Sequence, residues 1–160
     1  MPFTPFHLGP GALLKGAGGR HFSFMVFGGS QVLIDLEPGY RMIVGDAILH
    51  GPSHTVGGAL VIAIIATLIG KPISEFVLRL IRYPRPTMTW AASAAGAFLG
   101  TGTHILIDAV MHHDMQPWQP FAAGNGLLGA LSLPVLHGLC MAAGVFGALF
   151  YVWRLRRNAG

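Results

Sequence analysis

The sequence contains a single cysteine, Cys140, and few charged residues. One cysteine cannot form an intramolecular disulfide, and it excludes the cysteine-rich ligand sets of structural zinc sites. Charged residues make up 10% of the chain, whereas soluble domains carry about 25%. The net charge is +4, but no DNA-binding motif accompanies it, so we expect no nucleic-acid partner. These shortages argue against a soluble domain, a disulfide scaffold and a DNA-binding protein.

Targeting and repeat signals are also missing. The N-terminal MPFTPF has neither a basic leader nor a cleavage site, so we expect no signal peptide. We find no low-complexity tract and no convincing internal repeat. The sequence therefore predicts one membrane-embedded helical domain over residues 1–160.

Apolar residues dominate the chain, at 52%, and the mean hydropathy is +0.59. A helix needs about 20 apolar residues to cross a bilayer. Five stretches are candidates, the last two of them shorter: Val56–Gly70, Thr89–Met111, Leu127–Trp153, Phe6–Ala17 and Phe22–Leu36. They predict an all-α, multi-pass transmembrane helix bundle of about five segments, in which the first is short or re-entrant.

Local signals refine this prediction. Ile73–Arg82 has apolar residues at helical spacing, which predicts an amphipathic helix at the membrane surface or, alternatively, a solvated linker helix. Pro38 and Gly39 are expected to end the second segment. Two glycine pairs predict close helix approach: Gly57 with Gly58, and Gly96 with Gly100.

The basic residues orient the bundle, because cytoplasmic loops retain Lys and Arg. Of the ten Lys and Arg residues, all except Arg41 fall in alternate connections or after the last segment. The other connections, 37–53 and 112–124, carry acidic residues and three of the eight histidines. We therefore expect an outer N-terminus and a cytoplasmic C-terminus in a bacterial inner membrane, with the basic residues beside anionic lipid.

Histidines and carboxylates gather at the segment ends on the outer side. His104 and Asp108 are four residues apart near the end of the fourth segment, so they share one helix face. His50 and His54 repeat this spacing at the start of the third segment. Ionisable groups at membrane depth usually face a cavity, a partner or an ion. A metal site is one interpretation, and a His–Asp hydrogen bond between helices is the other.

Further candidates lie at the same depth. Asp35 and Glu37 end the second segment, with Asp35 preferred as a ligand, and His7 follows MPFTPF. In MHHDMQPWQPF, Asp114 is preferred over His112 and His113 as an additional ligand, while Trp118 and Phe121 suit an aromatic belt. His137, in the last segment, is expected to pack rather than bind a metal. The predicted metal ligands are His7, Asp35, His50, His54, His104, Asp108 and Asp114.

Imidazole and carboxylate ligands without thiolate fit a divalent metal, zinc first, with manganese or iron as alternatives. The number of candidates would also permit two ions ~3.5–4 Å apart. A metal-activated water would attack an ester or phosphoester, with spare carboxylates or imidazoles moving protons. The residues expected to act in this catalysis are Asp35, Glu37, His54 and Asp108.

These motifs resemble the bacterial inner-membrane family of membrane-bound metal-dependent hydrolases. The resemblance runs through MPFTPFHLGPG, SQVLIDLEP, LHGPSHTVGGAL and THILIDAVMHHDMQPWQPF. It implies roles for His7, Asp35, His50, His54, His104 and Asp108. Family members often have Asp-x-Asp where this chain has Asp35-Leu36-Glu37, and His-Arg-Gly-x-Thr-His where it has the segment from His50 to His54. The resemblance implies a metal hydrolase but no particular substrate.

Three functional classes follow from these residues. The first is a hydrolase acting on a lipid-like or envelope substrate at the outer face. The second is a non-catalytic, metal-binding accessory subunit of a larger membrane complex, and a homo-oligomer also fits. The third, a haem protein or metal transporter, ranks lowest because the histidines cluster at one end rather than at mid-depth.

Overall fold

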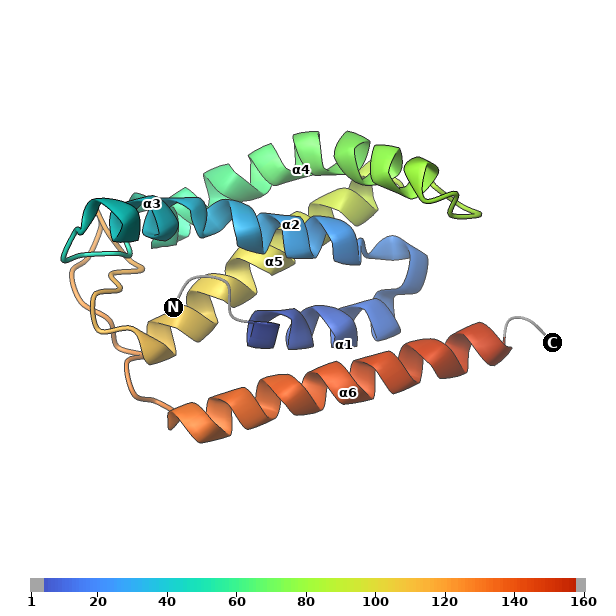
Figure 1. Ribbon diagram of the computed structural model, residues 1–160. Helices are drawn as coiled ribbons and strands as arrows, with labels where there is room; N and C mark the ends of the chain where they lie inside the picture. The colour runs from blue at the N-terminus through green and yellow to red at the C-terminus, as the bar shows by residue number, and fades with distance from the viewer. Residues whose placement is uncertain (1–4, 158–160) are drawn as a thin grey trace.

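The computed structural model describes residues 5–157. Within this range the apolar stretches of the sequence form helices, which are joined by turns and loops. The start of MPFTPF, and with it the signal-peptide expectation, lies outside these residues. No strand occurs within residues 5–157, which confirms the all-α prediction. The α-helices in this range are α1 (Leu8–Gly18), α2 (Phe24–Ile34), α3 (Leu36–Val44), α4 (Val56–Leu80), α5 (Trp90–Met111) and α6 (Leu133–Arg157) (Figure 1).

Three of these helices, α4, α5 and α6, are long and apolar enough to cross a membrane. Each has 22 or 25 residues, which at ~1.5 Å per residue gives at least ~30 Å, the thickness of a bilayer core. Their outward faces expose large apolar side chains, among them Ile64 and Leu68 on α4 and Phe146 and Leu149 on α6. Lipid is the solvent that suits such a surface.

The first two helices are half-length. α1 and α2 have 11 residues each, or about 16 Å of rise. They are joined by the 3-10 turn Gly19–His21, and they lie beside the long helices: α1 along α6, and α2 against α5 and α4 (Figure 1). The expectation of a short first segment is met, and α2 is equally short.

Glycines allow these helices to approach closely. A Cβ at Gly9 or Gly147 would overlap the backbone of the facing helix in the α1–α6 contact. Gly96 and Gly100 serve the α2–α5 contact in the same way, as their spacing predicts. The glycine pair at the start of α4 differs, because Gly58 is crowded by Pro52 while Gly57 has open space apart from Thr55.

The second segment does not end at Pro38 and Gly39, so that prediction is wrong. α2 ends at Ile34, Asp35 lies at the junction, and α3 continues through Val44. Pro38 occupies the first turn of α3, where a helix does not use the N–H that proline lacks. The break therefore falls at Asp35, and it places this carboxylate at a helix end.

Two other boundaries differ from expectation. Ile73–Arg82 is not a separate surface helix, because α4 passes through Pro72 and continues to Leu80. The last helix begins at Leu133 rather than Leu127. Residues before it form turns, in which Gly129 has a φ of +72°, a left-handed value that cannot be part of a right-handed helix.

The basic residues gather at one end of the bundle. The α1–α2 turn, the α4–α5 loop and the C-terminal end of α6 lie together there (Figure 1). Arg154 of α6 donates hydrogen bonds to the carbonyl oxygens of Gly16 and Ala17 at 2.8 and 2.6 Å. The opposite end carries α3 and the loops that contain four of the eight histidines.

Candidate metal centre

Four buried side chains from three parts of the chain meet at the end opposite the basic residues. His104 and Asp108 lie one turn apart on α5, His54 ends the 3-10 helix Pro52–His54, and Asp35 lies between α2 and α3. Each is at most 3% exposed. One ligand atom from each lies within 4.8 Å of all the others. These are four of the residues predicted from the sequence as metal ligands.

The distances among the four ligand atoms match a single coordination sphere. Donors about 2.0–2.1 Å from a tetrahedral ion lie about 3.3–3.4 Å from one another. His104 Nε2 lies 3.3 Å from Asp35 Oδ1, 3.1 Å from Asp108 Oδ2 and 3.3 Å from His54 Nε2. His54 Nε2 lies 3.7 Å from Asp35 Oδ1 and 3.5 Å from Asp108 Oδ2. The set therefore fits a small divalent cation.

Gln31 sets the orientation of the His104 ring. Gln31 Nε2 donates to the His7 carbonyl at 3.3 Å, so its Oε1 is the atom that accepts from His104 Nδ1, at 2.6 Å. With Nδ1 carrying the proton, the lone pair of a neutral His104 is on Nε2 and points at the cluster. Ser53 Oγ lies within hydrogen-bond distance of His54 Nδ1, at 2.9 Å.

The electrostatics of this cluster favour a cation. Two carboxylates and two imidazole nitrogens converge in a buried space, and like charges brought together this way repel. Although burial lowers the pKa of His54, hydrogen bonds to Asp108 and Asp35 hold it above its ordinary value. Positive charge, from a proton or from a metal ion, is therefore stabilised among these groups.

His7 adjoins the four-residue cluster from the start of α1. Its Nε2 lies 3.0 Å from Asp108 Oδ1, and its ring stacks on His104 with centroids 4.5 Å apart. The ring is buried, with 3% of the residue exposed. The structure therefore brings His7 to the site but places it on the second oxygen of Asp108.

A second set of ligand atoms shares Asp108. His50, Asp108 and His112 each offer one atom within 4.8 Å of the others. Asp114 lies behind His50, where it accepts from Nδ1 at 2.8 Å and from the backbone N–H groups of Leu49 and His50. Asp114 was expected to be a ligand, but the structure places it as a support for His50.

The pKa values of this second set reflect burial. Burial lowers the pKa of His50 against the opposing effect of Asp114, and it lowers the pKa of His112 to about 4. Burial alone would raise the pKa of Asp114, but the hydrogen bonds from His50 and Leu49 bring it down to about 2. At neutral pH both imidazoles are uncharged and have a lone pair to offer.

Other predicted site residues lie elsewhere. Glu37 Oε2 accepts from the Ser53 N–H at 2.7 Å, and its Oε1 accepts from Arg41 Nε at 2.9 Å, so it holds the His54 segment from outside both sets. His113 is exposed. His137 stacks on Phe6 at 4.2 Å, in keeping with a packing role. Gln31 was not predicted as a site residue, because its only signal in the sequence is an amide within an apolar segment.

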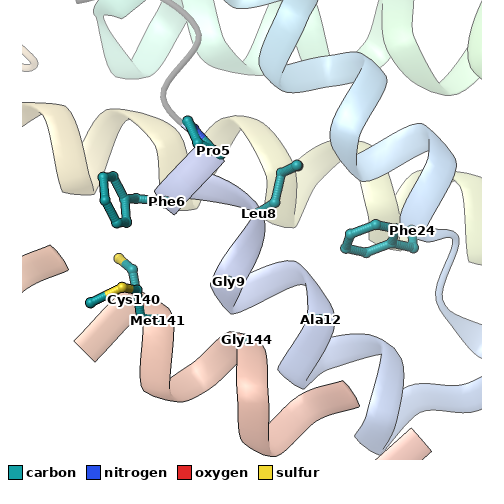
Figure 2. Close-up of a pocket in the computed structure, with 9 residues that line it drawn as sticks. All are labelled: Pro5, Phe6, Leu8, Gly9, Ala12, Phe24, Cys140, Met141 and Gly144. Atoms are coloured by element: carbon teal, nitrogen blue, oxygen red, sulfur yellow. The ribbon is translucent and has the colours of Figure 1, made fainter. Parts of the chain in front are cut away.

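An apolar cavity of about 330 Å³ lies near the start of α1, where this helix faces α6. Phe6 and Leu8, the two neighbours of His7 in the chain, line it together with residues of α2 and α6 (Figure 2). Ligand pockets are typically apolar cavities of about 300–1,000 Å³ with a few convergent polar groups. The cavity is large enough to receive part of an apolar molecule.

Comparison of the chain with protein-family models, with curated proteins and with solved structures finds no match. Function is therefore inferred from the geometry of the site.

Proposed function

We propose that the chain is a membrane-bound, metal-dependent hydrolase that cleaves an ester or phosphoester of a lipid-like or envelope substrate. The proposal rests on the convergence of ligand atoms from Asp35, His54, His104 and Asp108, five of whose separations lie between 3.1 and 3.7 Å. The resemblance of the sequence to inner-membrane metal-dependent hydrolases supports the same class of reaction.

Zinc is the metal that suits these donors best. Two imidazoles and two carboxylates, without thiolate, form a nitrogen and oxygen set, and tetrahedral coordination is the zinc preference. When bound, the ion would supply a Lewis acid and, with water as an additional ligand, would lower the pKa of that water. Manganese or iron would be accommodated only with additional ligands, because both favour more than four.

The residues around the four-residue cluster orient its donors and keep bulk water away from them. Gln31 fixes the tautomer and direction of His104, and Ser53 holds the His54 ring by a hydrogen bond to Nδ1; such supporting residues raise metal affinity. The donors come from two helix ends, at Asp35 and His54, and from one face of α5, which carries His104 and Asp108. Burial of the donors strengthens every charge interaction among them.

The surroundings support a lipid-like substrate. The apolar cavity begins at the residues that flank His7, and a second apolar pocket of about 270 Å³ lies at Trp118 and Phe121. Apolar cavities of this size would suit the alkyl chain of such a substrate. Because the basic residues lie at the opposite end of the bundle, the site would open on the outer face of a bacterial inner membrane.

The proposal is tested by hydrolysis assays on purified protein in detergent. Protein stripped with a chelator and then reloaded with zinc should cleave members of a panel of phospholipids and long-chain esters, and the stripped protein should not. The His54→Ala variant should be inactive, while His113→Ala should match the wild type. Zinc-loaded protein that cleaves nothing in the panel and co-purifies with other membrane proteins would instead indicate an accessory subunit.

A further inference from the structure

The His50, Asp108 and His112 set has the composition of a metal site of its own. His50 Nε2 lies 3.9 Å from Asp108 Oδ2, and His112 Nε2 lies 3.8 Å from Asp108 Oδ1. We propose that these three residues bind a second divalent cation and that the Asp108 carboxylate bridges the two ions. This inference deepens the proposed function and rests on its first metal site.

Asp108 has the geometry of a bridging ligand. Its Oδ2 lies 3.1 Å from His104, 3.5 Å from His54 and 3.9 Å from His50, so this oxygen is near donors of both sets. Its Oδ1 lies 3.8 Å from His112 and 3.0 Å from His7. A carboxylate placed between two donor sets in this way suits a pair of ions ~3.5–4 Å apart.

His50 is supported in the way that metal-binding histidines are. Asp114 Oδ1 accepts from His50 Nδ1 at 2.8 Å, and Asp114 Oδ2 accepts from the His50 N–H at 3.1 Å. A carboxylate on one ring nitrogen fixes the tautomer and leaves the other nitrogen free to bind a metal. The free nitrogen of His50, Nε2, faces Asp108.

The two sets differ in how open they are. The side chains of the first set are at most 5% exposed, whereas the His112 side chain is 22% exposed. The second set also has three donors rather than four. Catalytic metal sites keep a coordination position open for water or substrate, and structural sites are closed. The second ion is therefore the one that a substrate would reach.

Metal stoichiometry tests this inference without any assay of activity. Full-length protein in detergent, stripped and then dialysed against excess zinc, should hold two ions per chain. His112→Ala should hold one, and the matched control His113→Ala, which changes the exposed neighbour, should hold two. One ion per wild-type chain at saturation, or two in the His112→Ala variant, would overturn the proposal.

A spectroscopic measurement covers the case in which His112→Ala does not fold. Wild-type protein loaded with manganese should give the electron paramagnetic resonance spectrum of a coupled pair of ions. In a separate titration, the Asp114→Asn variant should bind the second ion 10–100-fold more weakly than the wild type. A spectrum of isolated ions in the saturated wild type would contradict the pair. Hydrolysis with a single ion would overturn this inference alone, and two ions without hydrolysis would overturn the proposed function alone.

Discussion

Gln31 accepts a hydrogen bond from the ring of His104 across 73 positions of sequence, at 2.6 Å. The same amide donates to the backbone carbonyl of His7. One side chain of α2 thus connects the start of α1 to His104 of α5. Residues that hold a ligand's second nitrogen are typically worth 10–100-fold in metal affinity.

Replacing Gln31 with Leu should therefore weaken zinc binding by 10–100-fold, because His104 loses the partner that fixes its tautomer. Competition against a chromogenic zinc chelator measures the change. Gln116, which is exposed, provides the control, since Gln116→Leu should bind zinc as the wild type does. Equal affinities of the Gln31 and Gln116 variants would contradict the role given to Gln31.

Glu37 should affect stability in a pH-dependent way. Burial alone would raise the pKa of Glu37, but hydrogen bonds from Ser53 and Arg41 hold it below its ordinary value of 4.5. A carboxyl with a lowered folded-state pKa stabilises the fold above the unfolded-state pKa, and this stability is lost as the pH falls through the folded-state value. Glu37→Gln should therefore cost about 1 kcal/mol at pH 7 and progressively less below pH 4.5.

Thermal unfolding in detergent at a series of pH values measures this difference. Asp46→Asn is the matched control, because Asp46 pairs with the same Arg41 but is more exposed, at 39% against 24% for the Glu37 side chain. It should cost less than Glu37→Gln at pH 7. A Glu37→Gln deficit that stayed constant from pH 7 to pH 4 would rule out the ionised carboxyl as its source.

Gly100 should be intolerant of a side chain. A Cβ there would meet Ser30 Oγ and the backbone of Phe27 on α2, whereas a Cβ at Gly102, half a turn away, would meet nothing within 4 Å. Gly100→Ala should destabilise the fold by about 1–3 kcal/mol through overpacking. It should also loosen zinc binding, because His104 is one turn away on the same helix.

Gly102→Ala should be neutral or slightly stabilising, since alanine favours helix by ~1 kcal/mol over glycine. Unfolding temperatures of the two variants in the same detergent make the comparison. If both variants unfold at the same temperature, the close approach of α2 and α5 is not what stabilises the arrangement of the site residues.

Arg154 should hold the half-length helix α1 against α6. Its guanidinium donates to the carbonyls of Gly16 and Ala17 at the end of α1, where helix carbonyls lack partners of their own. Arg154→Ala should lower stability by about 1–3 kcal/mol, and Arg156→Ala, at an exposed position, should change little. The unfolding temperature reports both, and the account of α1 docking fails if Arg156→Ala proves the more harmful.

Much of the fold could be predicted from the sequence because membrane helices follow from apolar length. Three long runs gave α4, α5 and α6, and the i,i+4 spacing of His104 and Asp108 placed both on one face of α5. The basic residues were expected on one side, and the structure gathers them at one end of the bundle. These features depend on local composition, which a sequence displays directly.

Other features depend on tertiary contacts and could not be predicted. A proline reads equally as the end of one helix or the first turn of the next, so Pro38 gave the wrong boundary and hid α3. Glu37 and Asp114 are acidic residues near the same segment ends as the predicted ligands. Only the fold shows that Glu37 holds the backbone next to His54 and that Asp114 holds the ring of His50. Gln31 carries no charge, so nothing in the pattern distinguished it from a packing residue.

The central claim is that Asp35, His54, His104 and Asp108 bind one cation together. X-ray absorption spectroscopy at the zinc edge, on the wild type and on His54→Ala, tests it most directly. The account predicts nitrogen and oxygen ligands at about 2.0–2.1 Å with imidazole scattering in the wild type, and loss of an ion from His54→Ala but not from His113→Ala. Folded wild-type protein that binds no zinc, or His54→Ala protein with an unchanged zinc content and spectrum, would contradict it.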